Sequence, residues 1–192
     1  MDGEPSHQAA EVERVREEAH RRAERSLFRS IFDANAGYVA ASLGRLGIAA
    51  GDRDDLVSEI FVRVHKELAT YDADRPIRPW LFAFAARVAS EHRRLARHRR
   101  EVIGEVADVP SAAPAADRLL EDGDAKRLVN VALEALDEDK RAVFVLHDLD
   151  ETPVPEIARA LGIAEGTAYS RLRAARAEFT AAVRRAQLGA RA

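Results

Sequence analysis

Residues 152–179, TPVPEIARALGIAEGTAYSRLRAARAEF, carry the pattern on which the fold prediction rests. They predict two helices joined by a tight turn. Thr152 is a good N-cap, and Pro153 suits the first helical position because that position needs no N–H donor. Gly162 stands where helices commonly end in a left-handed residue, and a second helix opens at Gly166.

The second of these helices has one apolar side and one polar side. Helical spacing collects its apolar residues into a stripe made of Ala168, Leu172, Ala175, Phe179 and Val183. Hydroxyl and guanidinium groups gather on the other side, at Thr167, Ser170, Arg171, Arg173 and Arg176. Arginine can bind guanine through two hydrogen bonds, and hydroxyls reach phosphates or bases. The stretch therefore predicts a DNA-binding helix-turn-helix, with an ordinary helical hairpin as the alternative.

Composition favours an all-α fold and excludes several kinds of site. The 192 residues are rich in Ala, Leu, Val, Arg and Glu. The chain has no cysteine, so disulfides and thiolate metal sites are excluded. No apolar run approaches the roughly 20 residues of a membrane-spanning helix, and the N-terminus lacks a signal-peptide pattern. We expect a cytoplasmic protein that is not inserted into a membrane.

The net charge of −3 hides two basic segments on either side of an acidic one. Residues 87–100 hold six arginines and one acid, whereas residues 102–151 hold 13 acids and five bases. Residues 152–192 hold seven arginines and three acids. Because local charge sets the attraction for phosphate, the two basic segments predict nucleic-acid contacts. The acidic segment can compete with DNA for these basic segments.

Three helices are predicted before the first basic segment. Residues 6–25 predict a charged, solvated helix, and residues 26–47 predict a helix with a broad apolar face. That face comprises Leu27, Phe28, Ile31, Phe32, Tyr38, Val39, Leu43 and Leu46. Residues 52–71 predict a helix that Asp52 caps and whose exposed edge is acidic.

A turn-rich loop and a helix of unusual composition follow. Residues 72–79 contain two prolines and two aspartates, which predict a loop. The next helix begins with Trp80 and Phe84 and ends in the arginine run. Unpaired DNA needs aromatic surfaces for its bases and cations for its backbone. The helix therefore predicts contacts with unpaired DNA, although both aromatic residues also suit a protein core.

Residues 102–117 lack periodicity and contain two prolines, which predicts a flexible linker between two small helical domains. Helical pattern resumes at Arg118, and Asp137 is expected to cap a later helix. The apolar stripe after the linker is Leu119, Leu120, Leu128, Val131, Ala132 and Leu136. The predicted organisation is an extension (1–25), a first domain (26–101), the linker (102–117), a second domain ending in the helix-turn-helix (118–186) and a tail (187–192).

No set of residues predicts catalysis or a cofactor. The histidines lack metal-ligand spacing, and neither a phosphate-binding glycine motif nor a nucleophile motif is present. We expect a protein that is not an enzyme and that holds no metal or cofactor.

Three strings together resemble the extracytoplasmic-function (ECF) sigma factors, the compact two-domain class of RNA polymerase sigma subunits. They are DDLVSEIFVRVHKEL (54–68), RPWLFAFAARVASEHRR (78–94) and LDEDKRAVFVLHDLDETPVPEIARALGIAEGTAYSRLRAAR (136–176). The resemblance covers about residues 26–185. It implies a protein that binds core polymerase, recognises the −10 and −35 promoter elements, and promotes promoter melting and transcription initiation.

The resemblance also implies partners and site residues. The partners are the beta-prime clamp and beta subunit of core polymerase, promoter DNA and an anti-sigma protein. The implied polymerase contacts are Asp54, Asp55, Leu56, Glu59 and Phe61. The implied −10 contacts are Arg75, Arg78, Trp80, Arg87, Ser90, Arg93, Arg94 and Arg97. The implied −35 contacts are Thr167, Tyr169, Ser170, Arg171, Arg173 and Arg176.

Two departures from the family pattern bear on the promoter sequence. Many members have an asparagine after the arginine of the Trp-bearing helix, where this chain has Val88, and a lysine is common where it has Tyr169. Two other functions remain as alternatives. One is a stand-alone helix-turn-helix regulator, which would not need the Trp–Arg helix. The other is a helical interaction protein that never touches DNA.

Overall fold

The computed structural model describes residues 7–103 and 123–189, and every regular element within these two ranges is helical. This confirms the predicted all-α fold. The chain divides into two compact units, residues 1–37 and 38–192. Among the helices of the described ranges, none combines the length and apolar character that crossing a membrane requires.

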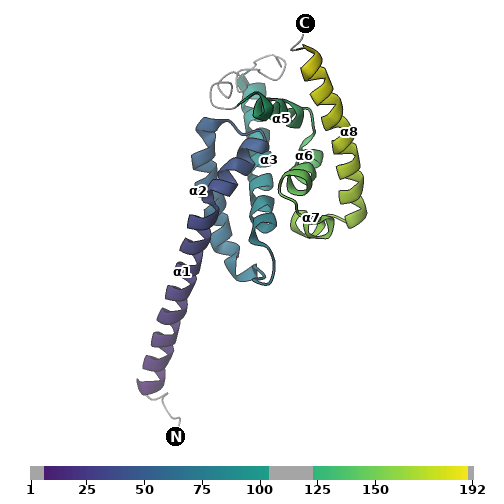
Figure 1. Ribbon diagram of the computed structural model, residues 1–192. Coiled ribbons are helices and arrows are strands. Elements are labelled where there is room, and N and C mark those ends of the chain that lie inside the picture. The colour runs from purple at the N-terminus through teal and green to yellow at the C-terminus, as the bar shows by residue number, and fades with distance from the viewer. Residues whose placement is uncertain (1–6, 104–122, 190–192) are drawn as a thin grey trace. The chain divides into compact units, whose positions relative to one another are not determined.

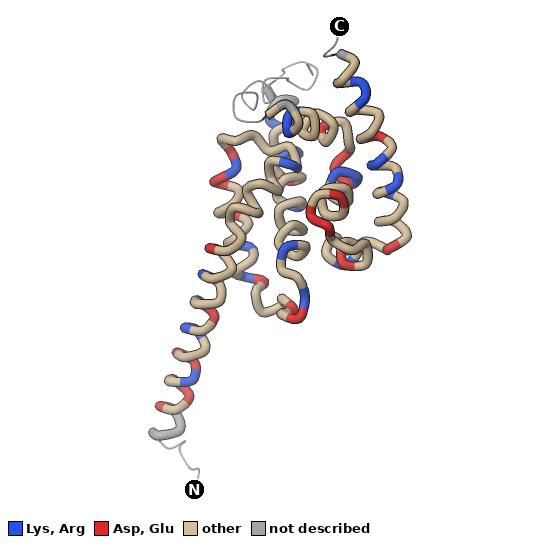
Figure 2. The backbone as a smooth tube through the Cα atoms, in the orientation of Figure 1, with Lys and Arg blue, Asp and Glu red and all other residues tan. Residues whose placement is uncertain are grey.

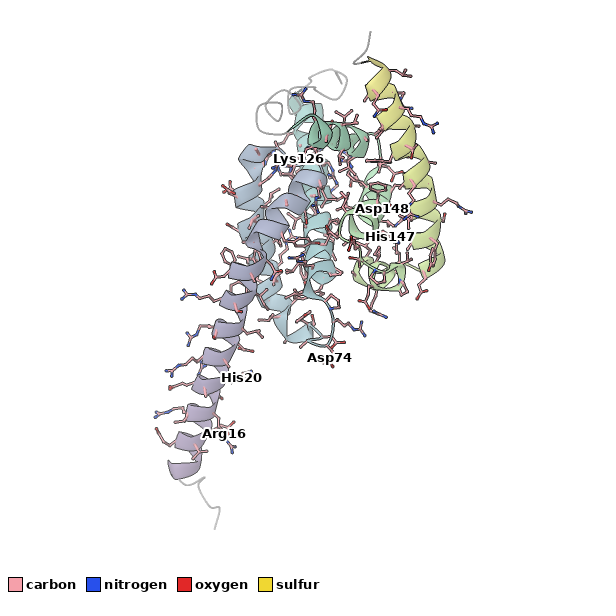
Figure 3. All side chains as sticks on the ribbon, viewed as in Figure 1. Arg16, His20, Asp74, Lys126, His147 and Asp148 are labelled. Atoms are coloured by element: carbon pink, nitrogen blue, oxygen red, sulfur yellow. The ribbon has the colours of Figure 1, made fainter. Side chains whose placement is uncertain are left out.

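The described part of the first unit is the start of a long helix, α1 (His7–Arg45), which continues into the second unit (Figure 1). Residues 11–27 are exposed, and acidic and basic residues are interspersed along them (Figure 2). His20 pairs with Glu24 one turn away at 3.2 Å, and its side chain extends from the helix (Figure 3). Side-chain contacts of this spacing stabilise a solvated helix modestly, in keeping with the charged, solvated helix predicted for this segment. The expected apolar face is only partly buried, because Leu27 is 52% exposed and Phe32 is 38% exposed.

In the second unit, the end of α1 packs into the core through Val39 and Leu43, and Leu46, the residue after the helix, is also buried. Gly47 follows with φ 92°, a left-handed conformation that favours glycine, and α2 (Ala50–Glu67) begins three residues later. The prediction that Asp52 caps α2 is wrong. The N-cap is Ala49, which forms no side-chain capping bond, and Asp52 lies inside the first turn.

Helices α2 and α3 (Ile77–Ile103) pack against each other (Figure 1). In the chain, the short 3₁₀ helix η1 (Leu68–Thr70) lies between them. Their shared core contains Ile60, Phe61 and Leu81, all at most 2% exposed. At the edge of this core, the Arg63 guanidinium donates to both Glu91 carboxylate oxygens at 2.6 and 3.1 Å. These bonds lower the pKa of Glu91 below its usual value. The ion pair therefore joins α2 to α3.

The predicted linker lies mostly outside the described residues, as do Leu119 and Leu120. After it come α5 (Asp124–Glu134), α6 (Glu138–Phe144) and a π-helical segment, η3 (Val145–Leu149). Asp137 caps α6 as predicted, since its carboxylate accepts the Lys140 backbone N–H at 2.8 Å. The predicted apolar stripe is partly wrong in α5. Val131, which it included, is 42% exposed, whereas Leu133, which it omitted, is 1% exposed.

The last two helices are α7 (Val154–Leu161) and α8 (Glu165–Gly189), and α8 packs on α5, α6 and α7. The prediction that Thr152 caps α7 is wrong, because the N-cap is Pro153. Thr152 is instead buried, and its backbone N–H donates to the Leu146 carbonyl at 2.8 Å. That bond anchors the entry to α7 on the π-helical segment, which the sequence pattern did not predict.

Candidate nucleic-acid interface

A tight glycine turn sets the geometry between α7 and α8. Gly162 has φ 66° and ψ 35°, the left-handed conformation expected from its position after α7. Its N–H donates to the last carbonyls of α7, and the Ile163 N–H donates to the Ala158 carbonyl at 2.9 Å. These bonds end α7 and direct the chain into α8 within three residues. The turn therefore has the form of a helix-turn-helix.

Helix α8 buries one side and exposes the other, as its pattern predicted. Ala168, Leu172 and Ala175 are at most 4% exposed and face α5, α6 and α7. Basic residues occur in both halves of α8 (Figure 2), and most of them are exposed. Four of the predicted −35 contacts are exposed: Thr167, Tyr169, Ser170 and Arg173. A side chain such as Tyr169, 56% exposed, is available for contact with a partner.

Carboxylates of α6 and η3 bind the side chains of the other two predicted −35 arginines. Arg171 donates to Asp139, which lies in the first turn of α6. Arg176 binds Asp148 with Nε–O distances of 3.0 and 3.2 Å and an Nη2–O distance of 2.6 Å. Asp148 lies beside His147 in η3 (Figure 3). Burial favours a higher pKa for Asp148, but the bonds from Arg176 lower it below the usual value. Arg176 thus ties α8 to the π-helical segment.

Aromatic rings gather at the start of α3 and in the loop before it. The centroids of Tyr71 and Trp80 are 5.0 Å apart, and those of Trp80 and Phe84 are 4.9 Å apart in an edge-on arrangement. Phe84 is 2% exposed and belongs to the core, whereas Trp80 is half-buried. The Arg87 guanidinium lies 4.6 Å from the Phe84 ring centroid. The half-buried Trp80 ring and the Arg87 guanidinium therefore both lie against the buried Phe84 ring.

A cavity of about 290 Å³ opens beside this cluster, and its volume approaches that of a small ligand site. Its lining includes Tyr71, Arg75, Trp80 and Arg87. An aromatic wall with two arginines suits a base and its phosphate. The cavity also has Arg159 of α7 in its wall, a residue that the sequence prediction did not include.

The remaining predicted −10 residues differ in their surroundings. Arg75 pairs with Asp72 at 2.7 Å, and the Arg78 guanidinium lies 5.2 Å from the Tyr38 ring centroid. The Arg93 Nε donates to Glu138 at 2.8 Å. Half-buried Ser90 and exposed Arg94 and Arg97 complete the set. Helix α3 therefore presents a basic surface in which Arg93 is already engaged.

The structure separates the predicted polymerase contacts on α2 into two groups. Asp54, Asp55 and Glu59 are exposed. Leu56 and Phe61 are 7% and 2% exposed and pack in the core beneath the exposed acids. Val62 was missed by the sequence prediction, although it is 55% exposed and follows Glu59 at helical spacing. A single exposed valine is common on protein surfaces, so the sequence pattern offered no strong signal for it.

Metal binding finds no support within the residues that the structure describes. No three His, Asp or Glu side chains gather there in a way that could hold an ion. Their carboxylates instead pair with arginines and lysines, as Lys140 does with Glu178 at 2.6 Å.

Two known protein families match this chain, one on each side of the predicted linker. Residues 31–100 match the family described as Sigma-70 region 2, and residues 126–179 match Sigma-70, region 4. These ranges contain the aromatic–arginine helix and the helix-turn-helix, respectively.

Individual proteins are similar over most of the chain. The ECF RNA polymerase sigma factor SigL of Mycobacterium tuberculosis is 34% identical over 160 residues, covering 78% of this chain and 85% of SigL. The RNA polymerase sigma factor NccH of Alcaligenes xylosoxydans xylosoxydans is 28% identical over 154 residues, covering 78% and 83%.

Solved structures share the fold. CnrH, in complex with the cytosolic domain of CnrY, superposes with a TM-score of 0.58 at 29% identity, covering 82% of this chain and 87% of CnrH. The sigma factor RpoE of Bartonella quintana, in complex with the anti-sigma factor NepR, gives a TM-score of 0.63 at 20% identity, covering 82% and 96%.

Proposed function

Since this chain belongs to the ECF family of RNA polymerase sigma factors, we propose specific roles for its surfaces in transcription initiation. The exposed side of α2 binds core polymerase. Helix α3 and the loop before it bind the −10 element, and α8 binds the −35 element. The observation that supports this assignment best is the exposed face of α8 at Thr167, Ser170 and Arg173, presented by a glycine turn.

Promoter opening follows from a difference in affinity between two DNA states. Extruding a base from the duplex costs a few kcal/mol. The protein shifts the equilibrium toward open DNA only by binding the unpaired strand more tightly than the paired one. At the cavity, Trp80 provides a stacking surface and Arg87 a positive charge for an unpaired nucleotide. A base that is still paired in the duplex cannot enter the cavity. The chain performs no covalent step in this scheme, and it acts in the cytoplasm with polymerase.

An anti-sigma protein is part of the proposal. The similar sigma factor RpoE was solved with the anti-sigma factor NepR, and CnrH with the cytosolic domain of CnrY. We expect a protein of this kind to bind the present chain and to compete with core polymerase.

The polymerase contact can be tested with exposed residues of α2. The double variant Asp55→Arg, Val62→Arg places two cations on the proposed surface without altering the buried Leu56 and Phe61. We expect at least about tenfold weaker capture of core polymerase, because a rim charge reversal and a lost apolar contact are each worth about 1 kcal/mol. Promoter-dependent transcription should fall in parallel.

The control for that experiment is the same exchange on α1. Val15→Arg, Glu18→Arg also converts one exposed valine and one exposed acid to arginine. It should leave polymerase capture unchanged. If the wild-type chain, correctly folded, captured no polymerase but bound duplex DNA tightly, the stand-alone regulator would replace the sigma assignment.

A further inference from the structure

The exposed part of α1 carries its apolar residues on one side. Residues 11–27 are all exposed, and Val12, Val15 and Leu27 are 51%, 57% and 52% exposed. At about 100° per residue, the apolar residues of this segment fall within about 120° of the helix circumference. This apolar face of α1 consists of Val12, Val15, Ala19, Ala23 and Leu27. A helix gains most of its stability by packing such a face, and the described part of the chain leaves this one uncovered.

Charge is distributed unequally along the same segment. Residues 11–18 hold four glutamates and two arginines, whereas residues 21–29 hold four arginines and one glutamate. When two such helices lie side by side and antiparallel, the acidic half of each meets the basic half of the other. A parallel pair would bring like charges together, which is unfavourable. The surface that complements this segment in charge is therefore a second copy of it, in the opposite direction.

One antiparallel register pairs the charges on both edges of the apolar face. If position 20 of one copy lies opposite position 20 of the other, facing residues have numbers that add up to 40. An antiparallel pair also brings the same edge of the face together from both copies. The facing residues of opposite charge are then Glu11 with Arg29 and Glu18 with Arg22 on one edge, and Arg16 with Glu24 on the other. All six of these residues are exposed.

The apolar residues meet in the same register. Leu27 of one copy lies level with position 13 of the other, between Val12 and Val15. Ala19 and Ala23 lie near the middle of the pair, where small side chains let two helices approach closely. The register derived from charge therefore also covers the apolar face, although charge and apolar positions are separate features of the sequence.

Ion pairs within the free helix are compatible with this arrangement. Glu24 lies 3.2 Å from His20 Nε2, and Glu11 binds Arg14 one turn away. Exposed pairs of this kind contribute little to stability. A carboxylate has two oxygens and can accept from more than one donor, so Glu11 and Glu24 can bind a cation of the second copy as well.

We propose that residues 11–29 of α1 bind the same residues of a second copy of this chain, forming an antiparallel helical dimer. The two-fold symmetry of the pair makes each contact occur twice. The contact is small, so the dimer is weak and depends on protein concentration. The segment contains none of the residues assigned to polymerase or promoter DNA, so the inference goes beyond the proposed function. Loss of the dimer is expected to leave polymerase capture by α2 unchanged.

Sedimentation of the full chain over a range of concentrations tests the dimer. We expect a reversible monomer–dimer equilibrium for the wild type. Arg16→Glu and Glu24→Arg each place like charges opposite one another twice, and each variant alone should dimerise at least about tenfold more weakly. An equal mixture of the two variants should form a heterodimer, because each supplies the charge that the other lacks. A wild-type chain that stays monomeric up to submillimolar concentration would overturn the proposal.

The matched control is Arg21→Glu, a charge reversal of the same size on the opposite side of α1. Arg21 is exposed and pairs with Glu17 of its own helix at 3.5 Å, so the variant also loses one exposed ion pair. It should dimerise like the wild type. Circular dichroism of each variant shows whether the helix content is retained. A dimer that Arg16→Glu leaves intact, or that Arg21→Glu weakens equally, would contradict the proposed interface.

Disulfide cross-linking determines the direction of the two helices. The protein has no cysteine, so each introduced cysteine is unique. Under mild oxidation, Val12→Cys should not cross-link to itself, because the two copies of this position lie at opposite ends of the pair. A mixture of Val12→Cys and Leu27→Cys should give a covalent dimer, since these positions lie at nearly the same level. Efficient cross-linking of Val12→Cys to itself would indicate a parallel pair and overturn the proposed register.

Discussion

Arg173 and Arg176 lie one turn apart on α8, but their surroundings differ. Arg173 is exposed, whereas Arg176 is bound by Asp148 through both Nε and Nη2. The same side-chain type therefore has two uses on one helix. Arg173 is available for DNA, while Arg176 fastens α8 to η3 and would reach DNA only by giving up that bond.

These surroundings predict separate effects of two alanine variants. Arg173→Ala should weaken promoter binding by the holoenzyme by about 1–3 kcal/mol, if it contacts a base, and should leave urea unfolding unchanged. Arg176→Ala should lower the free energy of unfolding by about 1 kcal/mol, the upper range for an exposed pair of good geometry. Urea titration and promoter-binding assays on both variants check this. Equal stability of Arg176→Ala and wild type would show that the pair is not structural.

The cap of α6 permits a second prediction at a single residue. Asp137→Ala should cost about 1 kcal/mol of unfolding free energy, because the Lys140 N–H loses its acceptor. Asp137→Ser is the matched control, since serine also caps helices well and should retain most of the stability. Urea titration of the three proteins is the measurement. A loss in the serine variant as large as in the alanine variant would implicate the Lys140 ion pair at 2.9 Å instead of the cap.

At the scale of elements, the turn between α7 and α8 depends on one glycine. Gly162 has φ 66°, and an added Cβ would meet no atom within 4 Å, so only the backbone conformation resists substitution. Gly162→Ala should therefore cost about 1 kcal/mol of unfolding free energy. Gly166→Ala is the control, because Gly166 lies inside α8, has open space around it and gains helix propensity. The two variants should move the urea midpoint in opposite directions, and a shift in the same direction would refute the account.

For the whole molecule, the carboxylates in arginine and lysine pairs determine the acid stability. Hydrogen bonding to Arg63 lowers the pKa of Glu91, and hydrogen bonding to Arg93 lowers that of Glu138. Burial favours higher values for Asp137 and Asp148, but Lys140 and Arg176 bring both below normal. Groups with a depressed folded pKa contribute stability above the unfolded pKa of about 4 and lose it as pH falls through the folded value.

This linkage predicts a midpoint of thermal unfolding that is nearly constant between pH 7 and about pH 5 and falls steeply below about pH 4. Unfolding scans at several pH values between 3 and 7 test it. The variant Glu91→Gln should show a shallower decline, because one of the acid-sensitive pairs has been removed. A decline centred above pH 6 would point to histidine instead.

Much of this protein follows from its sequence alone, because the deciding interactions are local. Helical spacing predicted the buried side of α8, the cap at Asp137 and the left-handed Gly162, each within a few residues of its partners. Two caps were misplaced, at Asp52 and Thr152. Several residues can cap one helix start, and packing of the preceding segment selects among them.

Only the tertiary structure decided which charges meet. The chain has 30 Lys and Arg residues and 33 Asp and Glu residues, so composition leaves the pairing open. Tyr38 and Asp150 are 112 positions apart, and Arg93 and Glu138 are 45 apart. The first pair joins the end of α1 to the residue after η3, and the second joins α3 to α6. The second pair also distinguishes the engaged Arg93 from the exposed Arg94. Periodicity is a local property and places a residue on a face, whereas the partner of that face depends on how the helices pack.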